Sequence, residues 1–66
     1  MSVELIEYRG HRLEVSNFGP GWRVFIYAPG SRLTEPRIPH TSDSNGRSAV
    51  IAEAKSIVDA RLGINP

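Results

Sequence analysis

The sequence contains no cysteine, so neither a disulfide bond nor a thiolate-bound zinc ion can stabilise its fold. It also lacks any apolar run that approaches the ~20 residues needed to cross a membrane as a helix. No basic segment followed by an apolar stretch, the pattern of a secretory signal peptide, is visible near the N-terminus. We therefore expect a cytoplasmic protein with no membrane contact, since a cysteine-free chain suits a reducing compartment.

A large excess of charge of either sign is missing as well. Eight basic residues face seven acidic ones, which gives a formal net charge of +1. Dedicated nucleic-acid-binding domains usually carry a clear basic excess, so the composition disfavours nucleic acid as the partner. Seven of the basic residues are arginines, which suit bidentate contacts to carboxylates or phosphates, although a GC-rich genome accounts for the same bias.

The chain is short, and its 66 residues make one domain at most. A domain of this size buries only about 60% of the surface that its unfolded chain exposes, so its stability is marginal. Small domains often gain stability by associating. A homodimer is therefore one expectation for this chain.

Three segments alternate apolar and polar residues as strands with one buried face do. Between the first two, Arg9-Gly10 suits a two-residue hairpin turn because glycine accepts positive φ angles. The NFGPG stretch at 17–21 predicts a loop, and Pro29-Gly30 ends the third segment. We expect strands at 3–8, 11–16 and 22–27.

A polar segment with two prolines covers residues 30–46. A loop of this length without any structure is unusual in so small a domain. We expect Leu33 and Ile38 to anchor it to the core, and a short edge strand is possible around Arg37-Ile38, where flanking prolines are tolerated.

The C-terminal part has the spacing of an amphipathic helix. Ser44 or Asn45 is expected to cap its start, and Gly63 suits the left-handed position after its last turn. Lys55 and Asp59 are spaced i, i+4 on its polar side. The predicted apolar stripe contains Val50, Ala54, Ile57 and Arg61, with Ile51, Val58 and Leu62 beside it.

Together these elements predict a single α+β domain over residues 1–66. It has a small antiparallel sheet of three strands, or four with the short edge strand, and one C-terminal helix packed on one face. One helix covers only one face of such a sheet, and we expect it to pack on Leu13, Val15, Trp22, Val24 and Ile26. The other face is then left open. We expect that open face to carry Glu7, Arg12, Glu14, Arg23, Phe25 and Tyr27.

The motifs Tyr8-Arg9-Gly10 and Gly21-Trp22-x-Val24-x-Ile26, followed by the alanine-rich stretch 49–62, resemble a family of short uncharacterised proteins of proteobacteria. This resemblance spans most of the chain and implies a fold, but no activity.

Parts of the same pattern resemble two characterised families. The Y-R-G motif, the tryptophan strand and the alanine-rich helix resemble the plant-type AP2 DNA-binding domain, which implies DNA contacts by Arg9, Arg12 and Arg23. The W-L-G-T-F strand of that domain is absent here. The order of three strands and a helix, with Pro29 after the central strand, resembles the HicB-like antitoxin fold, whose glycine-rich third strand and C-terminal extension are not visible.

The sequence shows no convincing catalytic or metal-binding motif. His40, Ser42 and Asp43 have the side chains of a nucleophilic triad, but they crowd within four residues of one loop. Triads normally take their members from separate rigid elements. His11 and His40 have no spacing that would bring metal ligands together. We therefore expect a protein that is not an enzyme and that needs no metal and no cofactor.

Two binding hypotheses remain for the open face. In the first, Phe25 and Tyr27 form an interface with an unknown protein partner or a second copy of the chain, because aromatic residues and arginine are enriched at interfaces. In the second, these rings stack on bases while Arg12 and Arg23 bind phosphate. A third reading has Phe25 and Tyr27 covered by the 30–46 segment and Leu33, which leaves no site.

Charge pairing favours the protein partner. A two-residue turn at Arg9-Gly10 puts Glu7 opposite Arg12, and pairing of Val15 with Trp22 puts Glu14 opposite Arg23. Arginines that are already neutralised by glutamates have less to gain from phosphate. The expected site residues are Arg12, Arg23, Phe25 and Tyr27 of the open face, with Arg9 beside them.

Overall fold

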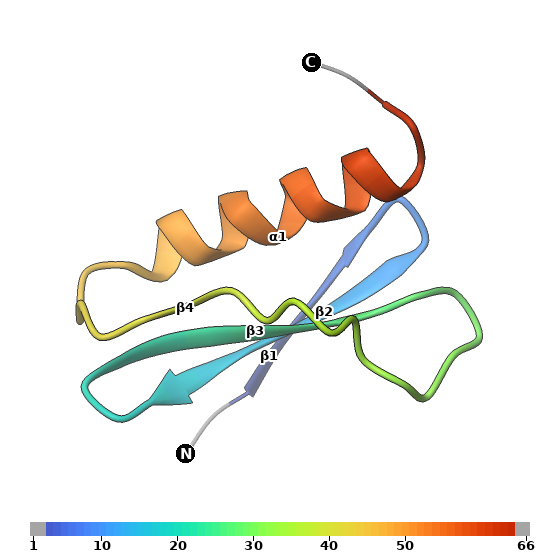
Figure 1. Ribbon diagram of the computed structural model, residues 1–66. Helices are drawn as coiled ribbons and strands as arrows, with labels where there is room; N and C mark the ends of the chain where they lie inside the picture. The colour runs from blue at the N-terminus through green and yellow to red at the C-terminus, as the bar shows by residue number, and fades with distance from the viewer. Residues whose placement is uncertain (1–2, 65–66) are drawn as a thin grey trace.

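Four antiparallel strands lie side by side in sequence order, and one helix covers one face of the sheet (Figure 1). The structure is a computed structural model and describes residues 3–64, so the first two and last two positions of the predicted domain lie outside the described residues. The predicted α+β class and the C-terminal helix are confirmed. The elements are β1 (Val3–Tyr8), β2 (His11–Phe18), β3 (Gly21–Tyr27), β4 (His40–Thr41) and α1 (Arg47–Arg61).

The fourth strand is present, but its predicted place at Arg37-Ile38 was wrong. It lies at His40–Thr41 and pairs with the start of β3. Arg37 and Ile38 lie between Pro36 and Pro39. The chain contacts β3 before this stretch, where the Glu35 amide donates to the Ile26 carbonyl at 2.8 Å, and after it, where the Val24 amide donates to the Pro39 carbonyl at 2.9 Å. Because proline has no N–H to pair, continuous pairing with β3 forms only after Pro39.

The turn between β1 and β2 determines their register as predicted. Arg9 and Gly10 both have positive φ angles, 50° and 80°, which is the geometry of a two-residue hairpin turn. Glu7 therefore lies opposite Arg12.

The predicted register between β2 and β3 was wrong by two residues. Val15 pairs with Val24 rather than with Trp22, and Arg23 lies opposite Ser16 rather than Glu14. The reason is that β2 continues to Phe18, so only Gly19 and Pro20 connect the strands, where a five-residue loop was expected. A shift of two residues leaves every side chain on its predicted face, because side chains alternate with a period of two.

The core lies between α1 and the covered face of the sheet, as predicted. From the helix, Val50, Ala54 and Val58 are buried, and Ile51 and Ile57 are half-buried beside them. Arg61 and Leu62, which the predicted stripe included, are exposed at the end of the helix. The sheet contributes Leu13, Val15, Val24 and Ile26, which are all at most 1% exposed, and Trp22 packs at the margin of the core.

The two ends of α1 differ in how well the sequence predicts them. Gly46 precedes the helix without a side-chain cap, so the predicted caps Ser44 and Asn45 were wrong. The side chain that acts in this turn is that of Asp43, which accepts a hydrogen bond from the Asn45 amide at 2.9 Å. At the other end, Gly63 has a φ of 76° and confirms the predicted left-handed position.

A polar cluster ties the β1–β2 hairpin to α1. The Tyr8 hydroxyl donates to the Asp59 carboxylate, with oxygen–oxygen distances of 3.0 and 3.1 Å, and Arg9 Nε lies 3.0 Å from the same carboxylate. The i, i+4 spacing of Lys55 and Asp59 does not produce an ion pair between them. The Lys55 ammonium lies 5.3 Å from the centre of the Tyr8 ring, and the Asp59 carboxylate pairs with the hairpin. Tyr8, and after it Asp59, raises the pKa of the Arg9 guanidinium.

We expect Tyr8→Phe to lower the free energy of unfolding by about 1 kcal/mol, because it removes a hydrogen bond to a charged group and leaves the ring in place. Urea denaturation measures the change. Tyr27→Phe is the matched control, since the Tyr27 hydroxyl lies 3.5 Å from Glu14, at the limit of a hydrogen bond. Equal losses in the two variants would contradict a special role for the Tyr8 hydroxyl.

Gly21 allows β4 to approach the sheet. It is buried, and a Cβ atom at this position would overlap the backbone of Thr41 and Ser42. No side chain can be accommodated here without displacing β4.

Gly21→Ala should therefore detach β4 and lower the free energy of unfolding by about 2 kcal/mol or more. Hydrogen exchange of the Val24 amide, which donates to Pro39, reports the detachment directly. Gly30→Ala is the control, since a Cβ there meets open space and only the positive φ of 72° is penalised. An unchanged exchange rate at Val24 in Gly21→Ala would contradict the steric argument.

Candidate interaction surface on the open sheet face

The face of the sheet opposite α1 is called the open face here, and Figure 1 shows no second helix over it. Strand alternation and pairing place its residues in three rows across the sheet. The six residues predicted for this face all belong to these rows. The rows are Val3, Ser16, Arg23 and His40; Leu5, Glu14 and Phe25; and Glu7, Arg12 and Tyr27, with Phe18 at the end of β2.

Apolar side chains are exposed on this face. Leu5 is 62% exposed, Val3 58% and Phe18 46%. These three residues were missed by the sequence analysis, although the alternation that identified Glu7 and Arg12 extends to them. Phe18 was missed because the NFGPG stretch was interpreted as a loop.

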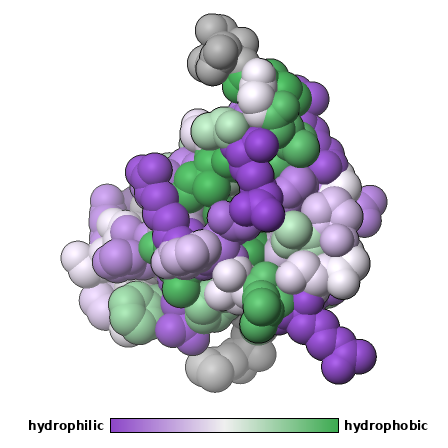
Figure 2. All heavy atoms as spheres, turned by 45° about the vertical axis from the view of Figure 1, so that its right-hand side comes forward, coloured by the Kyte–Doolittle hydropathy of each residue, from purple (hydrophilic) through white to green (hydrophobic). Residues whose placement is uncertain are grey.

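The expectation that Leu33 covers the open face was wrong. Leu33 is 81% exposed, and the 30–46 segment reaches the sheet instead through Thr34, which forms an isolated bridge with Tyr27. Phe25 and Tyr27 are half-buried: Arg12 lies over the Tyr27 ring and Arg23 over the Phe25 ring, and Pro36 and Ile38 line the same hollow as Phe25. Figure 2 views the molecule from the side rather than onto this face, and hydrophobic residues form separate patches between hydrophilic ones in that view.

Arg12, Glu14 and Tyr27 form one closed cluster on the open face. The Arg12 guanidinium lies 4.5 Å from the centre of the Tyr27 ring, and Arg12 Nε lies 3.5 Å from the Glu14 carboxylate. Tyr27 and Glu14 are themselves in contact through the hydroxyl group. The charge of Arg12 is therefore neutralised within the face, by Glu14 of its own strand.

Arg23 has a different environment from the one predicted for it. Its guanidinium lies between two phenylalanine rings, 5.0 Å from the centre of Phe18 and 4.8 Å from that of Phe25. Glu14 is not its partner, because the register shift places Ser16 opposite it. Arg23 Nε is buried and has no hydrogen-bond partner.

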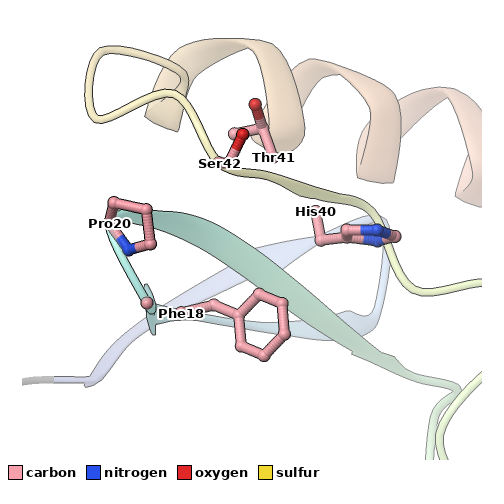
Figure 3. Close-up of a pocket in the computed structure, with 6 residues that line it drawn as sticks. Phe18, Pro20, His40, Thr41 and Ser42 are labelled. Carbon is pink, nitrogen blue, oxygen red and sulfur yellow. The ribbon is translucent and has the colours of Figure 1, made fainter.

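Two hollows flank the rings of Phe18 and His40, which meet edge to face with their centres 6.2 Å apart. The first, called the Arg23 hollow, has a volume of about 370 Å³. The second, called the turn hollow, has a volume of about 660 Å³ and is shown in Figure 3. The Arg23 hollow is lined by Phe18, Arg23, Phe25, Pro36, Ile38 and His40, and the turn hollow by Phe18, Gly19, Pro20, His40, Thr41 and Ser42.

The predicted site residue Arg9 does not lie with the others. It belongs to the cluster with Asp59 at the end of the hairpin, on the side of α1. The three arginines implied by the AP2 resemblance are thus divided: Arg12 and Arg23 share the open face, and Arg9 is engaged elsewhere.

Both histidines and Asp43, which were considered for chemistry, make local hydrogen bonds. His40 Nδ1 donates to the Ile38 carbonyl at 3.0 Å, and His11 Nδ1 donates to the Arg9 carbonyl at 3.1 Å. Asp43 accepts from Asn45, so it does not orient His40. Within residues 3–64, no group of three histidine, aspartate or glutamate side chains is placed to hold a metal ion.

Comparisons with protein-family models, curated proteins and solved structures find no match to this chain. The resemblances inferred from sequence motifs therefore stay predictions. Over the part of the chain that the structure describes, no helix is long and apolar enough to cross a membrane.

The contact between Arg12 and Tyr27 can be measured by a double-mutant cycle of Arg12→Ala and Tyr27→Leu. We expect a coupling free energy of about 0.5–1 kcal/mol, the range for a cation over an aromatic ring at a partly exposed site. Thermal and urea unfolding of the four proteins supply the values. Additive effects of the two substitutions would show that the stacking does not contribute to stability.

Proposed function

We propose that this chain is a small non-enzymatic module that binds a protein through its open face, either another protein or a second copy of itself. The observation that carries the proposal is the combination of exposed Leu5, Val3 and Phe18 with half-buried Phe25 and Tyr27 on one uncovered face. Aromatic residues and arginine are the side chains most enriched at protein interfaces.

The distribution of charge supports a protein rather than a nucleic-acid partner. Glu7 and Glu14 share the open face with Arg12 and Arg23, so the face has no excess of positive charge. Binding to a phosphate backbone gains affinity with each phosphate that a basic side chain neutralises, and two glutamates offset the two arginines of this face. The cytoplasmic location and bacterial origin expected from the sequence belong to the same proposal.

Single-stranded nucleic acid is the second candidate, because of one observation. The guanidinium of Arg23 lies over the Phe18 and Phe25 rings without an acidic partner among residues 3–64, and aromatic rings beside an unpaired cation are the elements that stack bases and bind phosphate. The glutamates on the same face weigh against this candidate.

Site-specific photocrosslinking tests the proposal. A benzoylphenylalanine residue is placed at Leu5 of the open face or, as the control, at Ser56 on the exposed side of α1. We expect a discrete adduct after irradiation of cells for Leu5 only. An adduct of twice 7.3 kDa identifies a second copy, and another defined protein mass identifies a different partner. An adduct that nuclease removes would support the second candidate, and adducts of equal yield at both positions would contradict the proposal.

Phe25→Ser with Tyr27→Ser should lower the yield of the Leu5 adduct at least tenfold while the protein remains folded. Circular dichroism and the dispersion of amide signals check the fold. If the double variant unfolds, these rings belong to the structural framework, and Val3→Ser with Phe18→Ser then tests the same surface with more exposed residues, position 5 still carrying the crosslinker. An undiminished adduct in a folded variant would show that the binding surface lies elsewhere.

A further inference from the structure

We propose that the Arg23 hollow is an anchoring site for a carboxylate of the bound protein, an aspartate or glutamate that lies close to a large apolar residue. This inference rests on the proposed function and specifies the chemistry of the partner. It is carried by the unpaired guanidinium of Arg23, by the hollow that this side chain lines, and by the adjacent turn hollow.

The arginines of this protein are mostly neutralised within the chain, and Arg23 is an exception. Five of the seven arginines pair with carboxylates, namely Arg9, Arg12, Arg37, Arg47 and Arg61. Among residues 3–64, no carboxylate pairs with Arg23 or with the exposed Arg32. Arg23 differs from Arg32 because it is half-buried, and a partly desolvated charge without a partner is costly.

The side chain of Arg23 is also held in place before any partner arrives. The rings of Phe18 and Phe25 lie about equally far from its guanidinium, at 5.0 and 4.8 Å. Such stacking leaves the edge of the guanidinium plane as the place for hydrogen bonds, and a carboxylate matches its paired N–H groups. An arginine that is already positioned loses less conformational entropy when it binds.

The hollow beside Arg23 has the size and lining for one acidic side chain. Its volume of about 370 Å³ is at the lower end of the range for small-ligand sites, and apart from Arg23 and His40 its walls are apolar. His40 lies opposite Arg23 in the sheet, and its Nδ1 donates to the Ile38 carbonyl. In the neutral ring Nε2 is then an acceptor, which leaves the guanidinium of Arg23 as the donor to the carboxylate.

The turn hollow is the place where we expect the apolar residue of the partner, next to the acidic residue in the Arg23 hollow. It shares the Phe18 and His40 rings with the Arg23 hollow and is bordered by Pro20. Two side chains on the same side of an extended peptide are about 7 Å apart, which is enough to straddle these rings. The acid and the apolar residue are therefore expected at positions i and i+2 of the partner.

Charge selects a protein carboxylate over a nucleic-acid phosphate. One unpaired guanidinium on the open face matches one anionic group, whereas a nucleic-acid strand presents a phosphate at every nucleotide. Further phosphates would meet Arg12 already paired with Glu14, and Glu7 would repel them. A single acidic side chain meets no such penalty.

The test uses the blocked peptide acetyl-Asp-Ala-Phe-amide as the probe, with acetyl-Asn-Ala-Phe-amide as its uncharged control and a thymidine tetranucleotide as the nucleic-acid control. Nitrogen–proton NMR spectra of the labelled full chain follow the Arg23 Nε–Hε signal and the amides of Phe18, Phe25 and His40. We expect these signals to shift with the Asp peptide, at the ~1 mM affinity of a single anchor, and to shift at least tenfold less with the Asn peptide.

Arg23→Gln should abolish the peptide-induced shifts, while Arg12→Gln, on the same face but paired with Glu14, should preserve them. If Arg23→Gln does not fold, Arg23→Lys replaces it; it keeps the charge, loses the planar guanidinium, and should bind the Asp peptide several times more weakly. Equal shifts with both peptides, no shifts up to about 10 mM, or preferential binding of the tetranucleotide would each overturn the inference.

The failure of this inference can be told apart from failure of the proposed function. If the Leu5 crosslink forms normally in Arg23→Gln, the open face binds a protein but not through a carboxylate at Arg23. If the crosslink is absent while the Asp peptide still binds, the hollow exists but the open face is not a docking surface for a protein.

Discussion

The packing of α1 against Leu13, Val15, Val24 and Ile26 is the interaction on which the rest of the structure depends. It is the only source of a buried core over residues 3–64, and it uses one face of the sheet. Because a single helix covers a single face, the other face stays at the surface. The open face is thus a direct result of having too few elements to enclose the sheet on both sides.

An uncovered sheet face with large side chains has to be stabilised by contacts within the face itself. Arg12 lies over Tyr27 and is neutralised by Glu14, so this part of the face is closed both in packing and in charge. Arg23 lies over Phe18 and Phe25, and no carboxylate of the described residues pairs with it. The two halves of the face therefore differ. In the Arg12 half the charge and the ring are paired within the face, whereas the Arg23 half presents a positioned cation beside a hollow.

The hollows depend on β4, and β4 depends on two small features of the chain. Pro39 accepts a hydrogen bond from Val24 and brings the chain to the sheet, and Gly21 leaves room for the backbone of Thr41. His40 then lies beside Arg23, and together with Phe18 it forms the wall between the two hollows. A residue with no chemical role of its own, Gly21, in this way positions a candidate site.

The residue pattern alone is enough to predict the order of the elements, the face of each strand residue and the helix that covers one side. These are local properties: alternation has a period of two, the helix stripe a period of 3.6, and a two-residue turn at Arg9-Gly10 aligns Glu7 with Arg12. The β2–β3 register and the place of β4 could not be predicted in this way. Both depend on the length of the connecting turn and on contacts between residues far apart in the chain, such as Val24 with Pro39. The surroundings of Arg23 follow from those contacts, since a shift of two residues preserves the face but exchanges Glu14 for Ser16 as its neighbour.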